Sequence, residues 1–151
     1  MLLRLALIVL LCAGSACAEE TRQAIKLADL PSAVRETVKL QQAGGNLLRL
    51  EKIVREGIPV YELEFSNGAA RKIVVMDATG KVLEIRQPVK LTEVSKAARA
   101  VIESSVGKGK FISLESVKTE AGIVAAYQVQ FELESKKTLL RIRPDGSLAQ
   151  E

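Results

Sequence analysis

The side chains of this chain that could do chemistry are mainly carboxylates. Glu62 and Glu64 stand two residues apart, so a β-strand would point both toward the same face. Paired carboxylates can act as a general acid and a general base. The chain contains no histidine, which excludes Ser-His-Asp and Cys-His nucleophile systems. No nucleophile–base pair accompanies the two glutamates, and we therefore predict that the protein is not an enzyme.

The other motifs with chemical potential have simpler explanations. Ser95 and Lys96 are adjacent, and neighbouring residues on a helix diverge by about 100°, so they would not face each other. The segments 77–80 and 144–146 have too few carboxylates for a calcium loop and are typical Asp/Gly turns. The segment 107–110 lacks the spacing and the hydroxyl of a phosphate loop. We predict no cofactor and no metal site.

The first residues have the layout of an export signal. Arg4 gives a short positive region, residues 5–11 form an apolar run, and a small-residue cleavage site ends at Ala18, which leaves Glu19 as the new N-terminus. Both cysteines lie in residues 1–18, so the predicted mature chain has no disulfide and no thiolate ligand for zinc. We expect the protein to be periplasmic or secreted.

The charge of the chain gives little support for nucleic-acid binding. The formal net charge of +4 falls to +3 when Arg4 is removed, and acidic residues are interleaved with the basic ones. The apolar run is shorter than the roughly 20 residues of a membrane-spanning helix. We therefore expect no nucleic-acid partner and no stable membrane span after the signal is removed.

The strand that would position the two glutamates belongs to a sequence repeat that occurs twice in the chain. The segment 61–65, Tyr-Glu-Leu-Glu-Phe, returns at 127–131 as Tyr-Gln-Val-Gln-Phe, 66 residues later, and the turn glycines Gly80 and Gly146 have the same offset. Each copy begins with apolar residues at helical spacing and continues with alternating segments typical of strands. The predicted strands are 47–54, 58–65, 71–76 and 81–86, then 111–118, 124–134, 138–143 and 147–149.

The predicted fold is therefore α+β, with two tandem repeats. Each repeat would contain one helix packed on a four-stranded antiparallel meander sheet. The predicted boundaries are a signal peptide at 1–18, a lead-in at 19–26, a first repeat at 27–87, a linker at 88–90 and a second repeat at 91–151.

The strand alternation predicts which side chains lie on the open face of the sheet, opposite the helices. Tyr61, Leu63 and Phe65 would face the first helix. A polar set would face outward, either as a bed for a ligand or as cross-strand charge pairs. This set comprises Glu62, Glu64, Gln128, Gln130 and Arg143.

The third strand of each copy predicts an apolar patch on the same open face. The 66-residue offset aligns Ile73 with Leu139 and Val75 with Arg141. An exposed apolar patch often marks an interaction site, and we take these four residues as the candidate partner-binding set. The alternative is that the other repeat or the lead-in segment covers the patch.

The chain resembles a known family in three of its motifs. These are the helix start at 30–34 (Leu-Pro-Ser-Ala-Val), the strand at 61–65 and the turn with its following strand at 77–84 (Asp-Ala-Thr-Gly-Lys-Val-Leu-Glu); the second copy keeps 127–131 and 145–148. Each copy resembles a PepSY-type domain, and the pair resembles the periplasmic PepSY-like, beta-lactamase-inhibitor-like group. The resemblance implies a shared concave surface and a non-catalytic role, such as inhibiting or chaperoning a peptidase or binding another envelope protein.

Two functions follow from these patterns. The first is a secreted, non-catalytic protein-binding module whose open sheet face docks an envelope protein such as a peptidase, as an inhibitor or regulator. The alternative is an envelope protein that binds a small ligand or a glycan on its polar open face.

Overall fold

The fold is built on one sheet. A computed structural model describes residues 20–149; the predicted signal peptide and its cleavage site between Ala18 and Glu19 lie outside this range. The described residues form an eight-stranded antiparallel sheet in which the strands follow one another in chain order. The strands are β1 (Thr21–Ala24), β2 (Asn46–Arg55), β3 (Ile58–Asn67), β4 (Ala70–Asp77), β5 (Val82–Pro88), β6 (Lys110–Lys118), β7 (Val124–Leu133) and β8 (Lys136–Ile142).

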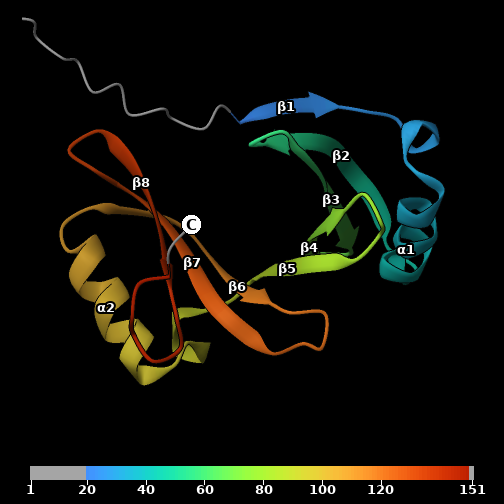
Figure 1. The fold of residues 1–151 in the computed structure, drawn as a ribbon. Helices are drawn as coiled ribbons and strands as arrows, with labels where there is room; N and C mark the ends of the chain where they lie inside the picture. The colour runs from blue at the N-terminus through green and yellow to red at the C-terminus, as the bar shows by residue number, and fades with distance from the viewer. Residues whose placement is uncertain (1–19, 150–151) are drawn as a thin grey trace, which may run out of the picture.

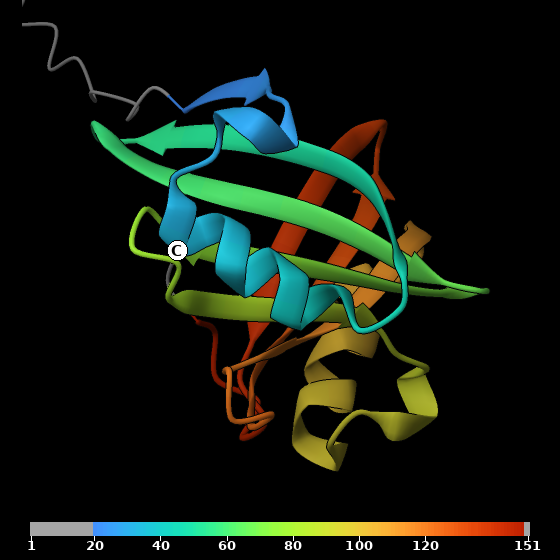
Figure 2. The ribbon, with the colours of Figure 1, turned by 90° about the vertical axis from the view of Figure 1, so that its right-hand side faces the viewer.

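Two helices and two short 3-10 turns complete the described part of the chain. They are η1 (Leu27–Asp29), α1 (Ser32–Gln42), η2 (Leu91–Glu93) and α2 (Lys96–Val106). Figure 1 shows α1 and α2 on opposite outer flanks of the molecule, with the sheet bending between them, and Figure 2 shows α1 lying across the strands of the first half. Among residues 20–149, no helix has both the length and the hydropathy needed to cross a bilayer.

The prediction of two repeats, each with its own four-stranded sheet, was wrong. β5 pairs with β6 over four positions, from Ile85 opposite Lys118 to Pro88 opposite Glu115, and this pairing joins the two halves into one sheet. The predicted last strand at 147–149 is reduced to a single bridge between Ile142 and Leu148. The second half thus contributes three strands to the shared sheet. The residues predicted as a linker begin inside β5, since Pro88 is already paired.

The segment predicted as a lead-in supplies the first strand. β1 pairs antiparallel with β2, from Thr21 opposite Val54 to Ala24 opposite Glu51. All four residues of β1 are exposed, so the segment has no apolar alternation that would mark it as a strand. Its pairing depends on the edge that β2 offers, which is tertiary context and not a local signal.

Each helix begins and ends at residues suited to a helix terminus. α1 follows Pro31, which needs no backbone N–H at a helix start, and it ends at Ala43 in the left-handed conformation. Thr92 lies in η2, before the second helix begins. Ser95 is the cap of α2, and its hydroxyl accepts a hydrogen bond from the backbone N–H of Ala98 at 3.3 Å.

Both helices pack on the same face of the sheet, over two separate apolar cores. α1 buries Val34 and Val38, and α2 buries Ala98 and Ile102. The prediction that Tyr61, Leu63 and Phe65 face the first helix is confirmed. Under α1 the buried strand residues are Leu50, Tyr61, Leu63, Phe65, Val74, Met76 and Val82; under α2 they are Leu114, Tyr127, Val129, Phe131 and Ile142.

The two Asp/Gly turns are held by hydrogen bonds to their own aspartates. The Asp77 carboxylate accepts hydrogen bonds from the Thr79 hydroxyl at 2.6 Å and the Thr79 backbone N–H at 2.8 Å. Asp145 accepts from the Ser147 hydroxyl at 2.7 Å and the Ser147 backbone N–H at 2.9 Å. These hydrogen bonds lower the pKa of both aspartates below the usual 3.8, and the hydrogen bond from the hydroxyl has the largest effect in each case.

The double substitution Asp77→Asn/Asp145→Asn is expected to flatten the acid limb of the stability curve. Because the folded-state pKa values are lowered, the contribution of the charged aspartates is complete above pH 3.8 and is lost as the pH falls through the folded values. Urea unfolding of both proteins across this acidic range tests the sign. The wild type should have the higher free energy of unfolding at neutral pH, and its difference from the variant should shrink as the pH falls. A difference that grows on acidification would contradict the lowered pKa values.

Candidate binding face

The face of the sheet opposite the helices is lined by charged residues from both halves. Strand alternation places Glu62 and Glu64 of β3 on this face, and the register sets Glu51 and Arg49 of β2 directly beside them. The same alternation continues through the β5–β6 pairing, so residues from β7 and β8 lie on this face too. We call it the concave face, because the sheet bends toward it between the two helices (Figure 1).

Glu62 is the centre of an ion-pair network on the concave face. Its side chain is only 5% exposed, and it receives the guanidinium groups of Arg49 at 3.0 Å and of Arg86 at still closer range. Arg22 of β1 approaches it at 3.6 Å. Three arginines from three strands therefore converge on one buried carboxylate, so that its charge is fully compensated.

Glu64 and Glu84 extend the network to both sides. Glu64 is buried and pairs with Arg49 at 3.2 Å and with Arg71. Glu84 of β5 binds Arg141 of β8 through two parallel hydrogen bonds of 3.1 and 3.2 Å. This two-pronged pair links strands from the two halves of the sheet and holds them in a defined geometry.

The predicted apolar patch is only partly exposed. Val75 is 3% exposed and forms a small buried cluster with Ile53 and Val60 on the concave face, so its predicted exposure was wrong. Ile73 is half-buried, whereas Leu139 is 44% exposed. Val75 is covered because it packs against Ile53 and Val60, whereas Leu139 on the outer strand stays accessible.

The predicted polar residues lie mostly on the concave face, but they do not form an open bed. Glu62, Glu64 and Gln128 are buried, and Gln130 is half-buried. Arg143 is exposed, and its guanidinium binds the Ser147 hydroxyl and the Leu148 carbonyl in the final turn. For the two glutamates, the interpretation as cross-strand charge pairs therefore holds.

Sequence reasoning missed the arginines that complete the network. Arg22, Arg49, Arg71 and Arg86 were not among the candidate residues. Arg49, Arg71 and Arg86 could have been found from the sequence, because strand alternation places their side chains on the same face of the sheet as the glutamates that they bind. Arg22 could not be placed in this way, since β1 itself was not predicted.

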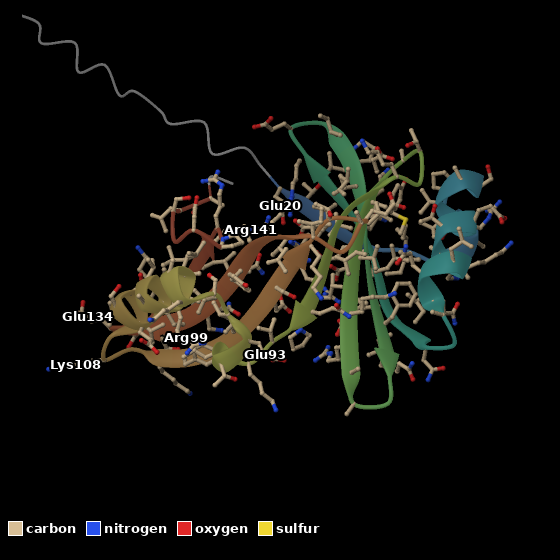
Figure 3. All side chains as sticks on the ribbon, turned by 90° about the horizontal axis from the view of Figure 1, so that it is seen from below. Glu20, Glu93, Arg99, Lys108, Glu134 and Arg141 are labelled. Carbon is tan, nitrogen blue, oxygen red and sulfur yellow. The ribbon has the colours of Figure 1, made fainter. Side chains whose placement is uncertain are left out.

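A groove lies where the two ends of the sheet approach each other. Its volume is about 610 Å³. Arg22 and Arg55 line it from the β1–β2 end, and Leu139 and Arg141 line it from β8; Figure 3 shows Arg141 and Glu20 near each other in this region. The groove is thus shared by elements that are more than 80 residues apart in sequence.

The β1 side of the groove carries charged groups that fix each other. Glu20 accepts hydrogen bonds from Arg22 at 2.7 Å and from Arg55 at 2.8 Å. Burial alone would raise the pKa of Glu20, but these hydrogen bonds outweigh it and lower the pKa. Burial would lower the pKa of Arg22, but the hydrogen bond with Glu20 and the charges of nearby glutamates raise it. Both groups are therefore held ionised at neutral pH.

A second hollow of about 430 Å³ continues the concave face toward β6. It shares Arg86 with the groove and adds the apolar side chains of Ile73 and Ile112. The two hollows together form a charged surface with apolar borders. Such a surface resembles a protein-docking site more than an enclosed small-molecule pocket.

The concave face offers no metal site. Among residues 20–149, no group of three or more acidic, histidine or cysteine side chains is placed to hold a metal ion. The buried carboxylates are instead paired with arginines.

Comparisons with known proteins identify the fold. No protein-family model matches the chain, and no curated protein is similar to it. Solved structures do match. A DUF2874 family protein from Bacteroides ovatus has a TM-score of 0.59 at 16% identity, over 80% of this chain and 85% of that one.

Two further matches are of the same kind. A BLIP-like protein from Bacteroides fragilis has a TM-score of 0.55 at 18% identity, over 80% of this chain and 84% of that one. A protein from Bacteroides eggerthii, provisionally described as periplasmic, has a TM-score of 0.60 at 14% identity, over 80% and 86% of the two chains. The chain therefore has a BLIP-like fold, and similarity at this level of identity establishes the fold alone.

Proposed function

We propose that this protein is a non-catalytic, periplasmic binding module that docks another envelope protein on its concave face. The observation that carries the proposal is the groove, in which two ends of one sheet meet around charged groups already fixed by ion pairs. A rigid, pre-ordered surface loses little conformational entropy when it binds a partner. The export signal predicted at residues 1–18 and the provisional description of one fold relative support the compartment.

A protein partner is favoured over a glycan or small ligand by the residues that line the groove. Its arginines are paired with carboxylates, and the two tyrosines of the chain are buried under the helices. Ligand pockets usually present aromatic side chains and a few free polar groups, and no aromatic residue is among those of residues 20–149 that line this groove. The resemblance to PepSY-type proteins makes an envelope peptidase the first partner to test, with inhibition or regulation as the proposed effect.

The test uses the chain from Glu19 onward as bait for envelope extracts and for purified envelope peptidases. The variant Ile73→Ser/Leu139→Ser changes the apolar borders on both halves of the concave face and is expected to weaken partner binding at least tenfold, since apolar anchors dominate interface energies. Affinity measured by calorimetry and peptidase activity measured in parallel separate binding from inhibition.

A matched control uses two exposed leucines on the helix side. Leu27 and Leu40 lie in η1 and α1 and are exposed. The variant Leu27→Ser/Leu40→Ser removes similar apolar surface from the other side of the molecule, and it should leave binding unchanged. Equal losses in the two double variants would rule out the concave face as the docking surface.

A further inference from the structure

The outer edge of β8 carries backbone groups that no other described residue uses. On that side, the Arg143 N–H donates to the Ser147 carbonyl and the Ala149 N–H donates to the Arg141 carbonyl, both at 2.8 Å. Alternate residues of a strand direct their backbone groups to the same side. The N–H and C=O groups of Lys137 and Leu139 therefore also point outward, and within residues 20–149 nothing pairs with them.

The chain itself demonstrates that this edge accepts an antiparallel strand. Its return segment pairs with β8 through the bridge between Ile142 and Leu148, and the last described pairing is that of Ala149 with Arg141. The rest of the edge, residues 136–140, is long enough for about two more pairs of backbone hydrogen bonds. A strand added there would extend the sheet by the same ladder geometry.

The charge of this edge selects the partner. The free part of the edge, residues 136–140, reads Lys-Lys-Thr-Leu-Leu, with two cations and no acid. We propose that the β8 edge binds an extended acidic segment of a partner protein by strand addition. This inference rests on the proposed function as a protein-binding module and names the chemistry of the partner at one end of the concave face.

A second copy of this chain fits the edge poorly. Arg141 is already paired with Ala149, so a second β8 strand could pair only along residues 136–140, and an antiparallel pairing about Lys137 would set Lys137 of the two copies opposite each other. Like charges directly opposite each other destabilise a strand pair, and edge lysines are a common means of preventing self-association. An acidic strand turns the same residues into favourable cross-strand pairs.

The groove also determines which side chains the added strand should carry. Leu139 and Arg141 face it from β8, so alternate side chains of an added strand would face it as well. An apolar residue opposite Leu139 would cover its exposed side chain, and acidic neighbours would approach Lys137 and the arginines at the β1–β2 end. The preferred segment therefore alternates acidic and apolar residues.

The experiment uses a short synthetic peptide of alternating glutamate and valine, with a lysine–valine peptide as its control. Fluorescence anisotropy should show binding of the glutamate peptide and at least tenfold weaker binding of the lysine peptide. Amide hydrogen exchange by NMR should show new protection at Lys137 and Leu139. Thr138 and Leu140 should change little, because their N–H groups already face β7.

Two variants of Lys137 distinguish the contribution of its backbone N–H to peptide binding from that of its side-chain charge. Lys137→Ala removes only the charge, whereas Lys137→Pro also removes the outward N–H and is tolerated on an edge strand. The proline variant should bind the peptide about fivefold more weakly than the alanine variant, as expected for one lost hydrogen bond. A charge reversal in the turn between β4 and β5, Lys81→Glu, should have no effect on binding.

Several outcomes would overturn the inference. Equal affinity for the two peptides, unchanged exchange at Lys137 and Leu139, or a concentration-dependent dimer that protects these amides would each do so. Capture of a protein partner that is lost in Ile73→Ser/Leu139→Ser but unaffected by Lys137→Pro would leave the proposed function standing and reject strand addition at β8.

Discussion

Glu62→Gln is expected to lower the free energy of unfolding by about 2–4 kcal/mol. The substitution keeps the shape of the side chain but removes the charge on which Arg22, Arg49 and Arg86 converge. Removing one partner of a buried ion pair leaves charges whose desolvation is no longer compensated. We place the loss below the largest values known for such changes because Arg49 is 40% exposed and regains solvation from water. Urea unfolding at neutral pH measures it.

The matched control is Glu36→Gln on α1. Glu36 pairs with Lys39 at 2.9 Å, but both side chains are about 70% exposed, and the loss should be much smaller than that of Glu62→Gln. High salt should erase most of the effect of Glu36→Gln and little of the effect of Glu62→Gln, because buried pairs are weakly screened. Similar losses and similar salt dependence for the two variants would mean that the network adds no rigidity to the concave face.

The network explains how a chain without disulfides in its described part keeps a defined concave surface. Arg86 bridges Glu62 and Glu84 on the first half, and Arg141 of β8 binds the same Glu84. Loss of Glu62 should therefore affect the position of Arg141 in the groove as well as stability. Partner binding of Glu62→Gln, measured where the variant is still folded, would report this coupling.

Most elements of the fold could be predicted from the sequence, whereas their assembly could not. The period of apolar residues placed α1, α2 and the long strands, because burial of one face imposes that period. The pairing of β5 with β6 has no comparable local signal. It depends on how the two halves meet, and four paired positions between Ile85 and Pro88 decide between two sheets and one.

The candidate site, too, could be predicted only in part from the sequence. Alternation placed Glu62 and Glu64 on the correct face, because strand parity is a local property. The burial of Val75 was not predictable from the alternation along its own strand, since it depends on packing against Ile53 of β2 and Val60 of β3. The part played by Arg22 depends on β1, a strand formed by four exposed residues that pair only because β2 has an open edge.

Gly80→Ala is expected to cost about 2–5 kcal/mol, by two separate effects. The residue has a φ of +81°, which costs an alanine about 1–2 kcal/mol. A Cβ atom there would also lie 2.6 Å from the Ala33 carbonyl oxygen and 2.9 Å from the Thr37 hydroxyl. Overpacking of this kind costs about 1–3 kcal/mol, because backbone must move. Chemical denaturation at neutral pH measures the total.

Gly57→Ala isolates the first of these effects, the conformational cost. Gly57 has a nearly identical φ of +79°, but a Cβ atom there would meet nothing within 4 Å, so only the conformational cost remains. The difference between the two variants therefore measures how tightly the β4–β5 turn is packed against α1, where the Thr37 hydroxyl donates to the Gly80 carbonyl at 2.7 Å. Equal losses would show that the turn can move away from the helix. A larger loss for Gly80→Ala would mean that α1 fixes the turn from which β5 starts, and through β5 the positions of Glu84 and Arg86 on the concave face.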